Sequence, residues 1–375
     1  MLQSMLIYTL CWLVSYILAS LRYKRLSKVR VKKGGVFVQG CETPKKMPFW
    51  MILVICTFFT LYNFYMTTNS VEMAGDRQNY LYDFDGGRES ASMGLLGIMG
   101  IIYLFGGSFE HLLYVSSFIS LLFPMLAYRY SKDSSPKVLL IFFLSLYILT
   151  SFTALKQCYT SAFASLALVL MLQNKNKLKE LLIILLMFLA MLFHPTGYIL
   201  PPIYIYFRFF NKGNVNIGRL LVVLFLVMLL FEPLMNLLGQ IFSVFSFFSA
   251  KIDEYFGSDA DKWEEHGVMS ILKGLPFYLI SYVGLKWRKR LCCKIANYDE
   301  YLLLSFICSF LFLMNIYNYW MSRFMFLFLF VVYLFFFQLV KHTEKSNALY
   351  IAVTAMTAII TYRDLYLIYT LYGGI

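Results

Sequence analysis

One short stretch of this chain carries a dense set of side chains that could do chemistry. Residues 74–94 read AGDRQNYLYDFDGGRESASMG, with four acids, two arginines and two tyrosines between apolar runs. Carboxylates serve as general bases, guanidinium groups bind phosphate, and aromatic rings stack on sugars. The alternative is a solvated loop whose charges pair with one another. The candidate residues are Asp76, Arg77, Tyr80, Tyr82, Arg88 and Glu89.

A second polar stretch, TALKQCYTSAFASLA at residues 153–167, has small and polar side chains at three- and four-residue spacing. This spacing predicts one polar helical face with Lys156 at its end. Such faces mostly pack against other helices in membranes, which is the alternative interpretation. Lys156 and Gln157 still need partners, because an unpaired charge inside a membrane costs on the order of several kcal/mol. A bound phosphate would satisfy the lysine.

Two further candidates lie at predicted helix ends. In LFHPTGYILPP (192–202) a helix should end at His194, because Pro195 removes a backbone donor. The dipole of a helix C-terminus favours imidazolium, so His194 is a candidate donor to phosphate or partner for an acid, with a structural role as the alternative. Arg323 in NYWMSRFMFLF (318–328) lies in the first turn of an apolar segment. Its alternative role is to snorkel to lipid headgroups.

The elements that must position these residues are apolar. The chain of 375 residues is 60% hydrophobic and only 14% charged, with a mean hydropathy of +0.67. This balance predicts an all-α, polytopic membrane protein. A helix crosses the hydrocarbon layer with about 20 residues, which gives about twelve spans. We place them near 1–21, 48–67, 111–128, 138–154, 157–173, 178–194, 198–210, 218–236, 268–285, 299–317, 321–340 and 347–362.

The distribution of positive charge decides how the short glycine-rich segment 93–105 sits. If this segment does not cross, 25 of the 33 lysines and arginines fall on one side of the membrane. The positive-inside rule then makes that side cytoplasmic and both chain termini external. We therefore expect 93–105 to be a short re-entrant or peripheral helix. The basic connectors are 22–48, 129–137, 175–179, 208–219, 286–294 and 341–345.

The remaining cations lie on the predicted external side, where the positive-inside rule does not explain their presence. Several of them should therefore bind an anion, which is either a ligand or one of the protein's own acids. Fourteen of the twenty acids are external on the same map, so internal pairing is a serious alternative. These eight cations are Arg77, Arg88, Lys156, Lys251, Lys262, Lys273, Arg323 and Arg363.

The chain reads as a single transmembrane domain, 1–375, with two external regions of interest. Residues 68–110 form a loop with a partial helix and are the candidate active site. The loop 237–267 mixes acids with aromatic residues and suits an acceptor glycan, or a mobile lid. The chain has no P-loop, no nucleotide-binding glycine motif and no zinc spacing. We expect no metal site, no cofactor and no nucleic-acid partner.

Four of these elements, in order, resemble the EpsG-like branch of the Wzy-type polysaccharide polymerases. They are GDRQNYLYDF followed by Glu89, ALKQCYTSAFASLAL with a short basic loop after it, LAMLFHPTGYILPP, and SRFMFLFLFVVY. Together they cover most of residues 70–340. Each motif is short and degenerate, so the specificity of the resemblance comes from their order and spacing.

The resemblance implies a membrane glycosyltransferase of GT-C-like architecture in the bacterial cytoplasmic membrane, with its active site facing outward. It would polymerise undecaprenyl-pyrophosphate-linked oligosaccharide repeat units into a surface polysaccharide (O-antigen, capsule or exopolysaccharide) by inverting, metal-independent transfer. Its partners would be this lipid-linked oligosaccharide, membrane lipid and a chain-length regulator. Where the family usually has Arg-Gln, this chain has Lys156-Gln157, which keeps the charge but loses bidentate phosphate contact.

In such a reaction, cations stabilise the leaving pyrophosphate and a carboxylate takes the acceptor proton. The expected catalytic residues are Asp76, Glu89 and His194, and the expected substrate-binding residues are Arg77, Arg88, Tyr80, Tyr82, Lys156, Gln157 and Arg323. Two other functions stay open. A flippase for lipid-linked sugars would also carry buried cations but often shows internal repeats, which are not seen. A membrane acyltransferase would also use a histidine, but the short internal loops offer no thioester route.

Overall fold

The computed structural model describes most of the helical part of the chain. The described residues are 7, 9–17, 20, 31–33, 36–38, 47–69, 77–86, 92–131, 136–143, 154–173, 176–210, 218, 222, 226, 267–315, 321–342 and 346–372. The predicted external loop 237–267 lies outside them, except for its last residue. So do parts of the predicted spans 1–21, 138–154 and 218–236.

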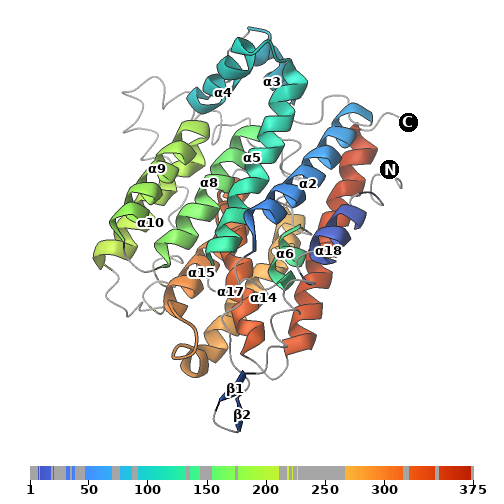
Figure 1. Ribbon diagram of the computed structural model, residues 1–375. Helices are drawn as coiled ribbons and strands as arrows, with labels where there is room; N and C mark the ends of the chain where they lie inside the picture. The colour runs from blue at the N-terminus through green and yellow to red at the C-terminus, as the bar shows by residue number, and fades with distance from the viewer. Residues whose placement is uncertain are drawn as a thin grey trace.

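The described elements are mainly helices (Figure 1). The first half contains α2 (Phe49–Asn69), α3 (Arg77–Phe84), α4 (Met93–Leu104), α5 (Phe109–Tyr130), α6 (Pro136–Phe143), α8 (Leu155–Met171) and α9 (Lys177–Phe193). The 3-10 helix η1 (Pro195–Ile199), α10 (Leu200–Ile205) and the π-helix η2 (Tyr206–Phe210) follow in one continuous run. The second half contains α14 (Gly267–Leu291), α15 (Tyr298–Met314), α16 (Met321–Met325), α17 (Leu329–Lys341) and α18 (Ser346–Tyr372).

The all-α prediction is confirmed for the described residues. These residues include two short strands, β1 (Val31–Lys33) and β2 (Val36–Val38), of three residues each. The strands pair antiparallel inside the basic connector 22–48. The expected total of about twelve spans and the GT-C-like architecture remain predictions. Among the described helices, only α5 is by itself both long and apolar enough to cross a membrane, and shorter apolar helices include α4, α8 and α17.

The outer surface of α9 indicates contact with lipid. Its inner face, with Ile183, Leu186 and Ala190, is buried against the bundle. Its outer face is equally apolar, yet Leu181 and Phe188 are more than half exposed. A broad apolar face without protein cover marks a binding or membrane surface. This helix, in a largely apolar all-helical chain, is consistent with a membrane protein.

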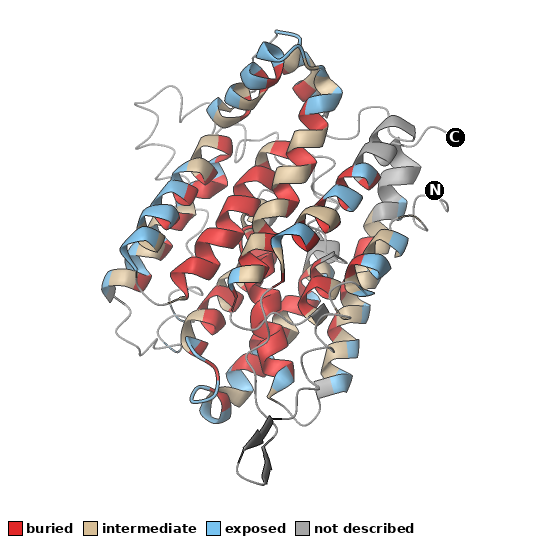
Figure 2. Cartoon of the chain, in the orientation of Figure 1, coloured by how far each residue is buried: buried red, intermediate tan, exposed pale blue. Residues whose placement is uncertain are grey.

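Two helices form the centre of the bundle. Every residue of α8 except Lys156 is buried, and so are residues 329–340 of α17, as the red ribbons in Figure 2 show. The small side chains of α8 allow α5 and α9 to pack closely on either side of it. Tyr159 donates to Ser116 of α5 at 2.8 Å, and Thr160 donates to the Ala190 carbonyl of α9 at 3.0 Å. The packing alternative for the 153–167 face therefore holds for these residues.

Three predicted elements differ in the structure. The charged connector after α2 contains the helix α3. The predicted span 198–210 is three short helices in succession, where Pro201 and Pro202 lie in the first turn of α10. The predicted span 321–340 is broken into α16 and α17. At this break the Arg323 carbonyl accepts from the side chain of Gln157, and the Leu327 amide donates to Phe324 in a tighter turn.

The described helix ends lie at two opposite ends of the bundle. This grouping agrees with the two membrane sides predicted from the sequence. At the end of the bundle near β1 and β2, the Gln173 side chain donates to the Tyr130 carbonyl and Asn297 donates to the Leu172 carbonyl. We call this the hairpin end. The opposite end, at the top of Figure 1, carries α3 and α4, and we call it the α3–α4 end. All four bonded residues belong to the hairpin-end, predicted cytoplasmic, group. Which end faces outward stays a prediction.

A polar cluster ties three elements together at the hairpin end. The Arg208 guanidinium of η2 contacts both carboxylate oxygens of Glu180 on α9, at 2.9 and 3.1 Å. Its Nη1 donates to the Met171 carbonyl at the end of α8. The Tyr204 hydroxyl also donates to Glu180, at 2.8 Å. The cluster therefore fixes how the irregular run 195–210 returns across the bundle.

We expect Glu180→Ala to lower stability by about 2 kcal/mol, or about 4 °C in melting temperature. The reason is that the Arg208 side chain, only 10% exposed, loses its carboxylate. The measurement is thermal unfolding of the purified protein in detergent. The control is Lys177→Ala, which removes an exposed charge one turn away. Equal melting temperatures for the two variants would contradict the assigned role.

Candidate functional site

The helix α3 gives the opening charged stretch a definite arrangement. Tyr80 and Asp83, three residues apart on the same helical face, are 1% and 3% exposed. Tyr82 faces away and is 56% exposed. Gly86 ends the turn after α3 with φ of +111°, a backbone angle that residues with a side chain rarely adopt. The exposed Tyr82 ring could reach a sugar, whereas the ring of Tyr80 is covered by protein.

Lys156 is the cation that covers Tyr80. Its Nζ lies 5.4 Å from the centre of the Tyr80 ring, within the range of a cation–π contact. The contact joins the first turn of α8 to α3. The structure thus brings together two predicted site residues that are 76 positions apart in sequence. The sugar stacking predicted for Tyr80 stays a prediction.

Gln157 connects the same end of α8 to α16. Its amide nitrogen donates to the backbone carbonyl of Arg323, and Gln157 itself is 2% exposed. Arg323 therefore lies in a separate short helix that α8 holds in place, and not in the first turn of a continuous span as predicted. A buried amide bonded to backbone is a strong local constraint, since leaving the carbonyl unpaired would cost about 1–3 kcal/mol.

His194 lies where α9 ends, as predicted, and begins η1. Its Nδ1 accepts from the Thr196 backbone N–H at 3.2 Å and lies 3.0 Å from the Thr196 hydroxyl. An acceptor Nδ1 places the ring proton on Nε2, so this geometry is that of a neutral imidazole and not of the expected imidazolium. The ring is nearly buried, at 8% exposed. A neutral Nε2–H can still donate to a phosphate oxygen.

The pairing of α8 with α9 places His194 and Lys156 at the same height along the axis of the bundle. These consecutive helices run antiparallel (Figure 1) and are joined by the bond from Thr160 to Ala190. Lys156 lies four residues before Thr160, and His194 lies four residues after Ala190. Four residues rise about 6 Å along a helix. Both polar residues therefore lie about one turn beyond the same contact, at the α3–α4 end.

The helix α4 packs beside this group. A Cβ on Gly94 would lie 2.7 Å from the Phe193 ring, so only glycine allows this approach. Phe193 in turn stacks on Tyr159 with ring centres 4.3 Å apart. The twelve residues of α4 rise about 18 Å, less than the ~30 Å hydrocarbon layer, which fits the expected short re-entrant or peripheral helix. Its far end, Leu104 and Phe105, is 85% exposed.

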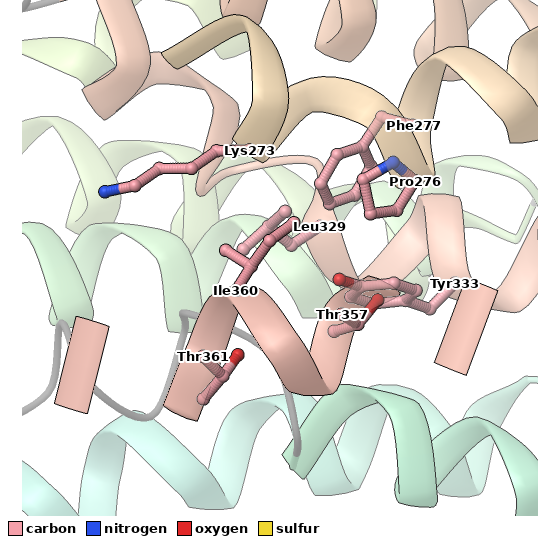
Figure 3. Close-up of a pocket in the computed structure, with 8 residues that line it drawn as sticks. All are labelled: Lys273, Pro276, Phe277, Leu329, Tyr333, Thr357, Ile360 and Thr361. Carbon is pink, nitrogen blue, oxygen red and sulfur yellow. The ribbon is translucent and has the colours of Figure 1, made fainter. Parts of the chain in front are cut away.

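Other cations of the predicted external side pair with an acid of the protein. Lys273 contacts Asp364 at 2.8 Å, and Arg363 contacts the same carboxylate at 3.3 Å. Lys273 borders a cavity of about 10 Å³, enough for roughly one water and lined also by Phe277, Tyr333 and others (Figure 3). The alternative of internal pairing thus holds for Lys273 and Arg363.

The remaining predicted site residues are not placed. Asp76, Arg88 and Glu89 lie outside the described residues, and Arg77 is described only as the first backbone position of α3. Asp83 is one of the four acids of the charged stretch that could serve as a base, and it is the one acid among the described residues that is fully buried. Its burial on the same face as Tyr80 follows from the helix α3, which the sequence did not predict. No group of three His, Cys, Asp or Glu residues that could hold a metal is found in the described part.

The comparisons with known proteins point to one family. The model of the EpsG family matches residues 50–372, from the second residue of α2 to the last residue of α18. The match therefore includes every predicted site residue. The curated proteins and the solved structures gave no match. Because the family match covers most of the chain, this protein belongs to the EpsG family and is an EpsG-like polysaccharide polymerase in the general sense of that family.

Proposed function

We propose that this protein joins undecaprenyl-pyrophosphate-linked oligosaccharide repeat units into a surface polysaccharide on the external face of the bacterial cytoplasmic membrane. The observation that carries the proposal is the cluster at the α3–α4 end. There Lys156 lies over Tyr80, Gln157 holds the Arg323 carbonyl, and His194 lies level with Lys156. Family membership supports polymer synthesis in general, and this cluster offers the cations and the donor that a pyrophosphate would need.

The chemistry is a displacement at the anomeric carbon of the growing glycan. A hydroxyl of the acceptor repeat unit attacks from the face opposite the pyrophosphate, forms the new glycosidic bond and inverts the configuration. The bond from the anomeric carbon to the pyrophosphate oxygen breaks, and negative charge develops on the leaving group. Donors and cations fixed in advance around that charge lower the barrier. The acceptor proton goes to a carboxylate.

The described residues fit distinct parts of this reaction. Lys156 supplies a point charge held against an aromatic ring, a role that does not need the bidentate contact of the arginine usual in the family. His194 supplies an Nε2–H donor. Arg323 supplies a guanidinium whose short helix is anchored by Gln157. Asp76 and Glu89 stay the candidate bases, and the burial of Asp83 suits it to orienting the cations.

Lipid-linked glycans in the strain that encodes this chain test the function class. Deletion of the gene should leave single repeat units on the carrier at the outer face of the membrane. Arg88→Ala and Glu89→Ala should reproduce that pattern while the protein still inserts. The control is Glu110→Gln, an exposed acid at the same end of the bundle. Repeat units found only at the inner face would indicate a flippase and overturn the proposal.

We expect Lys156→Met to reduce the rate of chain extension by about 100-fold or more, because a fixed charge next to the leaving group is lost. Lys156→Arg should retain extension, since it keeps that charge. Polymer length distributions on gels, normalised to the amount of inserted protein, give the measurement. Lys177→Met at the hairpin end is the control for loss of a lysine. Full activity in Lys156→Met would remove this residue from the site.

We expect Gln157→Leu to act through Arg323. The substitution removes the donor to the Arg323 carbonyl, so α16 and its guanidinium lose their anchor. Chain extension should fall as far as in Arg323→Ala, and the double variant should be no worse than either single variant. Ser165→Ala, which removes a buried hydrogen bond within the same helix, should extend normally. Additive losses would show that the two residues act independently.

A further inference from the structure

A larger cavity than the one beside Lys273 lies at the hairpin end, away from the cluster around Lys156. It encloses about 310 Å³, which is within the size range of small-ligand sites. The end of α5, the end of α8, the turn between α14 and α15, and the end of α17 form its walls. All of these belong to the group of helix ends predicted to face the cytoplasm.

The rim of this cavity is basic and polar. Lys294 and Lys341 line it and are exposed, and no acid is among the described residues that line it. Two nearby acids of the same end are bound elsewhere. Glu180 pairs with Arg208, and Asp299 pairs bidentately with Arg288, which raises the pKa of that guanidinium. The described residues that line the cavity therefore include two lysines and no acid.

The walls are held in place before any ligand binds. Asn297 adopts a left-handed backbone conformation, φ +57°, in the tight turn before α15, and its side chain donates to the Leu172 carbonyl. Gln173 donates to the Tyr130 carbonyl and accepts from Lys179 at 3.1 Å. These bonds fix the turn and the end of α8 relative to α5. A preformed cavity binds a small ligand at a lower entropic cost than a mobile one.

The deeper part of the cavity combines apolar surface with one unsatisfied polar atom. Leu172, Ile295 and Tyr301 are buried there, and Tyr301 is stacked on Phe335. Gln338 is 7% exposed, and its Oε1 is buried without a hydrogen-bond partner. Leaving such an atom unpaired costs about 1–3 kcal/mol. Gln338 lines the cavity, so a ligand that reaches this oxygen should offer a donor.

We propose that this cavity binds a phosphate ester that carries a free hydroxyl. The phosphate contacts Lys294 and Lys341 at the rim, the hydroxyl donates to Gln338 Oε1, and the carbon skeleton lies against Tyr301 and Ile295. Non-specific attraction of lipid headgroups to the basic connectors would need only exposed lysines. It would not explain the volume of the cavity or the Gln338 Oε1 that has no partner. Two sources have this chemistry, namely a glycerol-phosphate lipid headgroup and a soluble glycerol phosphate.

Native mass spectrometry of the purified full chain in detergent tests the site with three probes. These are short-chain phosphatidylglycerol, short-chain phosphatidylethanol, which lacks the hydroxyl, and glycerol 3-phosphate. The wild-type chain should bind one equivalent of phosphatidylglycerol and prefer it to phosphatidylethanol. The Lys294→Ala/Lys341→Ala variant should bind phosphatidylglycerol about tenfold more weakly. Gln338→Met should lose the preference between the two lipids.

The matched control is Lys286→Ala/Lys289→Ala, which removes two exposed charges from the same end outside the cavity. It should bind as the wild type does. Variant-sensitive binding of glycerol 3-phosphate would support the site with a soluble ligand, and binding of the lipid alone would support it with a headgroup. Equal weakening in the two double variants, or an unchanged preference in Gln338→Met, would overturn the proposal.

Discussion

The burial of α8 at the centre of the bundle constrains the rest of the structure. A helix covered on all sides must satisfy each of its polar side chains with protein or ligand, because no water reaches them. Its middle does so mostly with short side chains, as when Thr160 bonds to the Ala190 carbonyl, although the Ser161 hydroxyl has no partner among the described residues. Its first turn does so with longer ones, where Gln157 bonds to the Arg323 carbonyl and Lys156 lies over Tyr80. The positions of α9, α16 and α3 therefore all depend on one helix.

This dependence explains why the predicted span 321–340 is broken. A carbonyl that accepts from a side chain of another helix is less available to the amide four residues later. The Leu327 amide bonds to Phe324 in a tighter turn, and α17 begins only at Leu329. The break places Arg323 on a short helix that is separate from α17. For the phosphate contact proposed for Arg323, such local irregularity next to a packed core is typical of functional sites.

The sequence was sufficient to predict the features that follow from hydropathy and from proline. It predicted the all-helical class, the ends of α5 and α9 to within a few residues, and the grouping of helix ends into two sets. It could not reveal contacts that depend on tertiary structure. The bond from Gln157 to Arg323 joins residues 166 positions apart. The helix α3 was not predicted, because the polar composition of residues 77–84 is more typical of a loop than of a helix.

The tautomer of His194 also depends on a contact that the sequence did not reveal. A helix C-terminus favours a positive charge. This was the one electrostatic effect on His194 that the sequence indicated. In the structure Pro195 starts a second helix at once, so His194 also lies at the N-terminus of η1. The exposed N–H groups of that terminus need acceptors, and Nδ1 accepts from Thr196. With Nδ1 as an acceptor, the ring donates through Nε2.

The length of α8 relates its two polar ends to the membrane. From Lys156 to Leu172 the chain rises about 24 Å, close to but less than the ~30 Å of hydrocarbon. A helix of this length that spans the apolar layer places Lys156 near one boundary and the cavity beside Leu172 near the other. A shorter helix would leave a lysine in hydrocarbon at a high cost. The closely packed core around α8 thus separates the proposed pyrophosphate site from the proposed phosphate-ester site.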